Sequence, residues 1–88
     1  MKIQTTKPFD EDYHALPQDI KQRANKQFAL LLANPRHPSL RLKRMAGHPE
    51  IWEGSITRKY RFTFQIAGDT YILRRIGEHE RTLCKMTE

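Results

Sequence analysis

Cysteine, glycine and long apolar segments are all scarce in this chain of 88 residues, which has one cysteine and four glycines. A single cysteine, Cys84, cannot form an intrachain disulfide, so we expect a protein of a reducing compartment such as the cytoplasm. The sequence has no glycine-rich phosphate-binding loop and no nucleophile elbow. On these grounds P-loop nucleotide hydrolases and α/β-hydrolases are excluded.

Segments that would place the protein in or across a membrane are missing too. The longest apolar run, Phe28 to Ala33, is far shorter than the roughly 20 residues that span a bilayer. Met1 to Gln4 contains no signal-peptide h-region. The four histidines lie far apart and match no metal-ligand spacing. We therefore expect no membrane contact, no metal ion and no other cofactor.

Positive charge is what the chain has in excess. Lysine and arginine number 16 against 10 aspartates and glutamates, which gives a formal net charge of +6. Such a balance favours an anionic partner, for example nucleic acid or an acidic protein segment, although scattered basic residues can also serve solubility alone. The length fits one small domain, which we expect to span residues 1–88.

The clearest secondary-structure pattern lies between Ile51 and His79 and predicts two consecutive β-hairpins. Residues 60–66 alternate apolar with polar side chains, which is the period of a strand with one buried face. Gly68-Asp69 predicts a two-residue turn of type II′, and residues 70–77 return as the partner strand. This turn sets a register in which Phe64 pairs with Leu73, Phe62 with Arg75, Thr63 with Arg74 and Arg61 with Ile76.

The two faces of this hairpin differ in chemistry. The core face carries Tyr60, Phe62, Phe64, Ile66, Tyr71 and Leu73. The opposite face carries Arg61, Thr63, Gln65, Ile72, Arg74 and Ile76. Arg61 and Arg74 stand there at diagonal positions, about 7–8 Å apart. Because mid-strand arginines indicate an external partner, we predict the site at this pair, with His79 just beyond the strand end. We also expect that removing Arg61 leaves the fold nearly unchanged.

Two helices and a short first strand precede this region. Residues 2–6 fit a strand, and Phe9, Tyr13 and Leu16 follow the spacing of a short helix. Pro17 separates this helix from a second one that ends at Asn34-Pro35.

The segment after the helices predicts two more strands. Residues 40–45 alternate, which places Leu40 and Leu42 inward and Arg41 and Lys43 outward. Residues 47–50 fit a loop, and residues 51–56 fit a strand that turns Trp52 inward. The order is β-α-α-β-β-β-β, an α+β fold in which a helical hairpin packs on one face of a small antiparallel sheet.

Several segments in this order resemble the RelE/ParE superfamily of bacterial type II toxins, in its RelE-like branch. The segments that carry the resemblance are Leu16-Pro17, Asn34-Pro35, Leu42 to Gly47, Ile51-Trp52-Glu53, Tyr60 to Phe64 and Arg74 to His79. They cover nearly the whole chain. The resemblance implies a RelE-like fold and a cognate antitoxin that is small, acidic and partly disordered.

The resemblance also implies metal-independent cleavage of mRNA on the ribosome. In that reaction the ribose 2′-OH attacks the adjacent phosphate, which requires a base, an acid and cations around the phosphorus. Arg61 matches a family arginine that stabilises the transition state, and His79 matches a proton-transfer residue. By the same resemblance, Lys43 is expected to act as a second cation or proton-transfer group. The residues expected to hold RNA are Arg41, Arg44 and Arg74.

Two departures from the family leave alternatives open. Many active relatives have a basic residue on the strand where Glu53 and Ser55 stand, and several have an aromatic residue at the position of Leu83. Either Glu53 serves as a carboxylate base, or the enzyme is slow, or the protein does not cleave RNA. The alternative is a non-enzymatic inhibitor, for example of DNA gyrase, or a catalytically silent relative that only binds its antitoxin.

Overall fold

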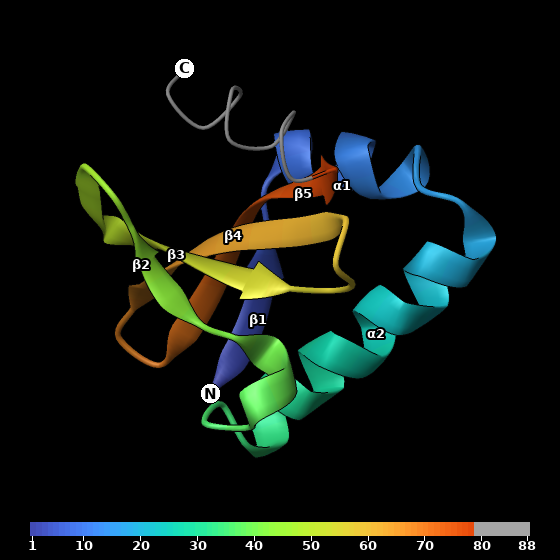
Figure 1. Cartoon of the computed structure of the whole chain (residues 1–88). Helices are drawn as coiled ribbons and strands as arrows, with labels where there is room; N and C mark the ends of the chain where they lie inside the picture. Colours follow the sequence, from blue (N-terminus) through green and yellow to red (C-terminus); the bar gives the residue numbers. More distant parts are fainter. Residues whose placement is uncertain (79–88) are drawn as a thin grey trace.

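The computed structural model describes residues 1–78, and no helix in that range is long and apolar enough to span a membrane. The elements are β1 (Lys2–Thr5), α1 (Lys7–His14), α2 (Gln18–Ala33), the 3-10 turn η1 (Pro38–Leu40), β2 (Lys43–Met45), β3 (His48–Ser55), β4 (Tyr60–Ala67) and β5 (Thr70–Glu78). Figure 1 shows α2 along one side of the sheet and α1 at the end of β5. The predicted order and the α+β class are confirmed.

Within the described range, one sheet of five strands runs in the order β1-β5-β4-β3-β2. The three pairs formed by β2 to β5 are antiparallel, as hairpins require. β1 pairs with β5 in parallel, with Ile3 opposite Tyr71. The sheet is therefore mostly antiparallel, and the parallel edge is a feature that the sequence did not predict.

The core lies between this sheet and the helices. Phe62 is fully buried, and its ring meets Phe28 of α2 edge-on at 5.1 Å between centroids. Phe9 of α1 packs on Phe28 at 5.8 Å. Gln27 of α2 is also buried, and its Nε2 donates to the carbonyl oxygens of Ser39 at 3.3 Å and Ser55 at 2.9 Å. This amide ties α2 to η1 and to the end of β3.

A β-bulge interrupts the pairing of β4 with β5. From the turn up to Phe64 and Leu73 the register is the predicted one. It then shifts by one residue, so that Thr63 pairs with Arg75, Phe62 with Ile76 and Arg61 with Gly77. The three pairings predicted beyond Phe64 are therefore wrong, because an extra residue in one strand moves every later position to the other face. Ile76, expected on the polar face, is buried in the core.

The first helix closes the edge of β5 beyond the end of β1. Thr6 caps α1, since its Oγ1 accepts from the Phe9 amide at 3.3 Å and donates to the Arg74 carbonyl at 3.1 Å. Asp12 Oδ2 accepts from the Ile76 amide at 3.3 Å. These contacts give hydrogen-bond partners to the Arg74 carbonyl and the Ile76 amide at the edge of the sheet.

Two local predictions between the helices and β3 are wrong. The segment predicted as a strand from Leu40 to Met45 begins instead with η1, and Arg41 follows in the left-handed region at φ 47°. This conformation breaks the alternation, so only Lys43–Met45 pairs with β3. The predicted loop at residues 47–50 is mostly strand, since β3 already begins at His48. The Gly68-Asp69 turn is confirmed, with Gly68 at φ 61°, which suits the first position of a type II′ turn.

Replacing Phe62 by alanine should destabilise the fold by about 3–5 kcal/mol, because it leaves a cavity between α2 and the sheet. Ile66→Ala is the matched control on the same strand, since Ile66 is 49% exposed, and it should cost about 1 kcal/mol or less. Urea unfolding of both variants measures the difference. An equal loss of unfolding free energy in the two variants would show that Phe62 does not belong to the core.

Candidate functional site

The sheet face opposite the helices, called the outer face, holds most of the predicted site. Its side chains are identified by strand pairing, because residues directly opposite each other point to the same side. The pairs are Lys43 with Glu53, Glu53 with Thr63, Ser55 with Arg61 and Thr63 with Arg75. Strands β2 to β5 thus bring basic, acidic and hydroxyl groups together on one surface.

Arg61 and Glu53 form an ion pair on this face. Arg61 Nε lies 3.7 Å from Glu53 Oε1, and the two side chains are 18% and 5% exposed. Arg61 Nη1 donates to the Thr57 carbonyl, and to the Tyr60 carbonyl at 3.1 Å. Arg61 therefore holds the turn between β3 and β4 as well as a buried carboxylate. These contacts argue against the expectation that loss of Arg61 would leave the fold nearly unchanged, which stays to be measured.

The ion pair fixes the direction of the guanidinium. Carboxylate and carbonyl oxygens hold Nε and Nη1, while within residues 1–78 no hydrogen bond engages Nη2 of Arg61. An arginine held in this way presents its remaining N–H groups in a fixed direction, which suits recognition of a phosphate oxygen. Among the described residues no three histidine, cysteine or acidic side chains converge to hold a metal ion.

A fully buried hydroxyl lies beside the ion pair. Thr63 is 0% exposed, and its Oγ1 has no hydrogen-bond partner in the described part of the chain. Met45 and Ile51 form a second, small buried cluster, and Ile51 lies on the outer face because it is two residues from Glu53 on the same strand. Sequence reasoning missed this cluster, although alternation along residues 51–55 pointed to it.

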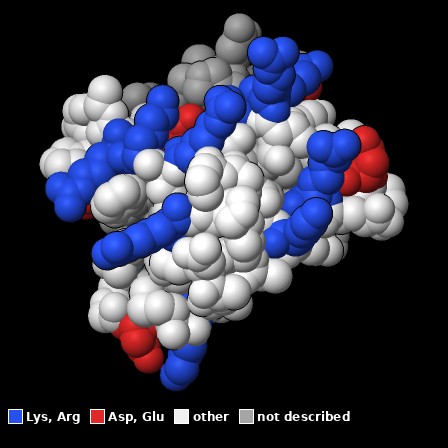
Figure 2. Space-filling model, turned by 60° about the horizontal axis from the view of Figure 1, so that its bottom comes forward, with Lys and Arg blue, Asp and Glu red and all other residues white. Residues whose placement is uncertain are grey.

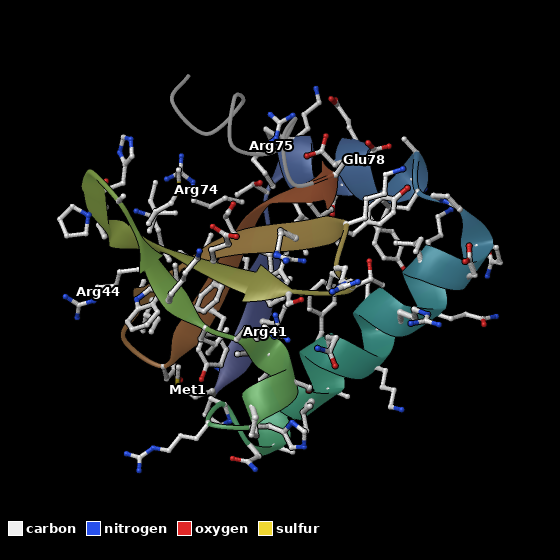
Figure 3. All side chains as sticks on the ribbon, viewed as in Figure 1. Met1, Arg41, Arg44, Arg74, Arg75 and Glu78 are labelled. Atoms are coloured by element: carbon white, nitrogen blue, oxygen red, sulfur yellow. The ribbon has the colours of Figure 1, made fainter. Side chains whose placement is uncertain are left out.

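The bulge places Arg74 and Arg75 together off the core face, since Leu73 and Ile76 on either side are both buried. Arg75 is engaged within the fold: its Nε and Nη2 donate to the two oxygens of Asp12 at 2.8 and 3.1 Å. Arg74 is half-buried, and Figure 3 shows it on the same upper side of the view as Arg75. Arg74 thus lies off the core face, half-buried beside Arg75.

Arg41 and Arg44 do not join the outer face. Arg44 pairs with Trp52, whose side chain lies on the helix side of the sheet, and its guanidinium carbon is 5.1 Å from the centre of that ring. Arg41 lines a groove that also contains Trp52. Figure 3 shows both arginines in the lower half of the view, away from Arg74.

Of the six predicted site residues, the structure therefore places Lys43, Arg61 and Arg74 off the core face of the sheet, on the strands β2, β4 and β5. The expectation that Arg41 shares an outward face with Lys43 is wrong, because the left-handed conformation of Arg41 breaks the alternation. His79, and also Leu83, lie outside the described residues.

No protein-family model matches the chain, and no curated protein matches its sequence. Solved structures do match. YafQ from E. coli strain BL21(DE3) superposes with a TM-score of 0.75 at 12% identity, over 90% of this chain and 93% of that one. The YoeB/ParE toxin from Agrobacterium tumefaciens gives a TM-score of 0.76 at 18% identity, over 90% and 99%.

A third match is the RelB–RelE antitoxin–toxin complex from Methanococcus jannaschii, with a TM-score of 0.73 at 21% identity over 92% of this chain and 95% of that one. The chain has the RelE/ParE toxin fold. The resemblance inferred from sequence is thus confirmed at the level of the fold. In this RelE/ParE fold the outer face is built by β2 to β5, and the helices cover the opposite face.

The interaction between Glu53 and Arg61 should be measurable as a coupling free energy of unfolding. Arg61→Met removes the cation beside a carboxylate that is 5% exposed, so it should destabilise the fold by about 3 kcal/mol. Adding Glu53→Gln should recover part of that loss, with a coupling of about 1–3 kcal/mol in a double-mutant cycle read by urea unfolding. Arg58→Met, at an exposed position of the neighbouring turn, is the control. Strictly additive losses would show that the two side chains do not interact.

Proposed function

We propose that this chain is the toxin of a type II toxin–antitoxin system in the cytoplasm, and that it cleaves mRNA on the ribosome without a metal ion. The observation that carries the proposal is the match of at least 90% of the chain to the fold of toxins from three organisms. One of these, RelE of M. jannaschii, is bound to its antitoxin RelB. A cognate antitoxin is accordingly the expected partner of this chain.

The outer face supplies groups that suit RNA cleavage. Arg61 would stabilise the charge that develops on the phosphate oxygens, because the Glu53 carboxylate and the turn carbonyls hold its guanidinium in place. Lys43, exposed beside Glu53 on the paired strand, would serve as the second cation or as a proton-transfer group. Arg74 would bind the RNA backbone. His79 remains the proposed acid or base on sequence grounds.

Glu53 acts in this proposal as a positioning residue. A general base must reach the proton that it removes, whereas the Glu53 side chain is 5% exposed and lies against Arg61. This argues against the carboxylate-base alternative that the sequence left open.

A second candidate function is supported by the contacts of Arg61 itself. Since this arginine holds a buried carboxylate and two backbone carbonyls, its role can be structural alone. In that case the chain would act without chemistry, as an inhibitor of DNA gyrase or as a silent relative that only binds an antitoxin.

Expression of the chain in bacteria should arrest growth and produce new mRNA fragments with 5′-OH ends. Arg61→Lys keeps a positive charge near Glu53 but loses the planar fork, so the cleavage rate should fall by about 10²–10³. Arg58→Lys is the control on the adjacent turn and should cleave as the parent does. Sequencing of RNA 5′ ends measures cleavage, and circular dichroism verifies that each variant is folded.

The outcomes separate the candidates. Growth arrest with loss of DNA supercoiling and without new 5′-OH ends would replace cleavage by gyrase inhibition. Normal growth with neither effect, in cells that contain the folded chain, would leave only the silent relative.

The salt dependence of RNA binding should identify the face that contacts the phosphates. Each phosphate contact contributes about 0.7 to the slope of log K against log salt for a single strand. Lys43→Ala and Arg74→Ala should each flatten the slope by about that amount, while Arg41→Ala, with the same loss of charge, should leave it unchanged. Fluorescence anisotropy with a labelled single-stranded RNA measures the slopes. A loss in the Arg41 variant equal to that of Lys43→Ala would show that RNA also contacts the groove side.

A further inference from the structure

A pocket of about 680 Å³ lies on the helix side of the sheet, where α2, η1 and the residue after β3 meet. The helix lines it with one face, at the spacing i, i+3, i+4 and i+7, through Arg23, Lys26, Gln27 and Leu30. The volume is within the roughly 300–1,000 Å³ that is usual for small-molecule sites. These helix residues belong neither to the outer face nor to the groove beside Trp52, so the pocket is a separate candidate site.

The charge of the pocket is positive. Arg23 and Lys26 line it and are exposed, and no acidic side chain lines it. None of the ion pairs between described residues includes either of these two cations. Figure 2, in which the bottom of Figure 1 comes forward, shows lysine and arginine side chains spread over that face with few acidic ones among them. Two such cations at one pocket favour an anionic ligand.

The pocket also offers a hydrogen-bond acceptor. Gln27 is 9% exposed, and its Nε2 donates to the carbonyl oxygens of Ser39 and Ser55 at 3.3 and 2.9 Å. Because both partners are acceptors, the amide nitrogen must face them, and the orientation of the amide is fixed. Within residues 1–78 no hydrogen bond engages Oε1, and this oxygen is not among the buried atoms without a partner. Oε1 is therefore accessible, on a residue that lines the pocket, and can accept from an N–H group of a ligand.

The segment before η1 adds a histidine whose tautomer is fixed by a hydrogen bond. His37 lines the pocket, and the Ser39 backbone N–H donates to its Nδ1 at 3.1 Å. A backbone amide nitrogen can only donate, so Nδ1 is unprotonated and the proton of the neutral ring sits on Nε2. No hydrogen bond in the described part of the chain engages Nε2, so His37 adds an N–H donor to the two cations. Three separate donors suit a phosphate monoester, which has three terminal oxygens and a charge of about −1.5 to −2.

We propose that this pocket binds a small phosphate monoester with a flat, partly apolar body, of the kind that a nucleoside 5′-monophosphate represents. The phosphate lies against the two helix cations and His37 Nε2. The body contacts Leu30 and the buried Ile56, and an N–H group of the base donates to Gln27 Oε1. The pocket and Arg61 lie on opposite sides of the sheet, so the proposal does not depend on RNA cleavage and holds equally for a silent relative.

The probe is adenosine 5′-monophosphate, because its base carries an exocyclic amine that can donate to an amide oxygen. Titrated into the isotope-labelled full chain, it should cause saturable NMR shifts of the Gln27 side-chain amide and of the Ser39 and Ile56 backbone amides. Adenosine and inorganic phosphate should each bind at least about tenfold more weakly, since each lacks one half of the ligand. The analogue with two methyl groups on the amine keeps the base and the phosphate but has no amine donor, and it should bind about two- to tenfold more weakly.

Variants of the chain test the charged part of the pocket. Arg23→Met and Lys26→Met remove two charges at exposed positions of α2, and methionine is a good helix former. The double variant should weaken binding of the nucleotide by about tenfold, the sum of two exposed charge contacts. The control is the double variant Lys2→Met and Lys21→Met, with the same loss of charge. Lys2 lies on the edge strand β1, and Lys21 lies over the Tyr13 ring at 5.8 Å, so the control should bind as the parent does. Circular dichroism verifies that each variant is folded.

Several outcomes overturn the proposal. One is the absence of saturable shifts at Gln27, Ser39 and Ile56, and another is an equal loss of affinity in the two double variants. Inorganic phosphate that binds as tightly as the nucleotide would reduce the pocket to a simple anion site. A uridine oligonucleotide with a free 5′-OH that binds at the same amides more tightly than the nucleotide would assign the pocket to a nucleic-acid chain. RNA cleavage by the same preparations is measured in parallel, so failure of nucleotide binding is distinguished from failure of the proposed activity.

Discussion

The bulge between β4 and β5 decides which side of the sheet every later residue of β5 faces. Without the shift after Phe64 and Leu73, Ile76 would point away from the helices and Arg75 would enter the core. With it, Ile76 is buried against the helices, and two consecutive arginines leave the core face. The same shift brings Arg75 to Asp12 of α1, so the position of the first helix also depends on this one extra residue.

On the outer face, the Glu53–Arg61 pair contributes to the stability of the fold and also holds the candidate site arginine in place. A carboxylate buried in the middle of a sheet is costly unless a cation and hydrogen bonds compensate it. Arg61 supplies the cation and, through Nη1, also holds the carbonyls of the β3–β4 turn. The guanidinium is therefore positioned before any ligand arrives, which is what stabilisation of a transition-state charge requires.

The basic residues of the chain are divided between the two sides of the sheet. Lys43, Arg61 and Arg74 lie on the outer face, whereas Arg41 and Arg44 lie beside the groove on the helix side. Arg41 leaves the alternation because its left-handed conformation turns the chain before β2 begins, whereas Lys43 and Arg44 point to opposite sides because they are neighbours on one strand. The basic residues that look like one patch in the sequence thus lie on two opposite sides of the sheet.

The sequence by itself determined the features that depend on neighbouring residues. Alternation identified the core face of β4, Pro17 and Asn34-Pro35 marked the limits of α2, and Gly68-Asp69 specified the turn, because each signal acts within a few residues. It also identified the RelE-like resemblance and three of the outer-face cations. Only the tertiary structure decided the bulge, the parallel pairing of β1 with β5, and the partners of the charged groups. Those depend on contacts such as Asp12 with Arg75, 63 positions apart, where packing of the whole chain, and not local periodicity, selects the register and the pairing.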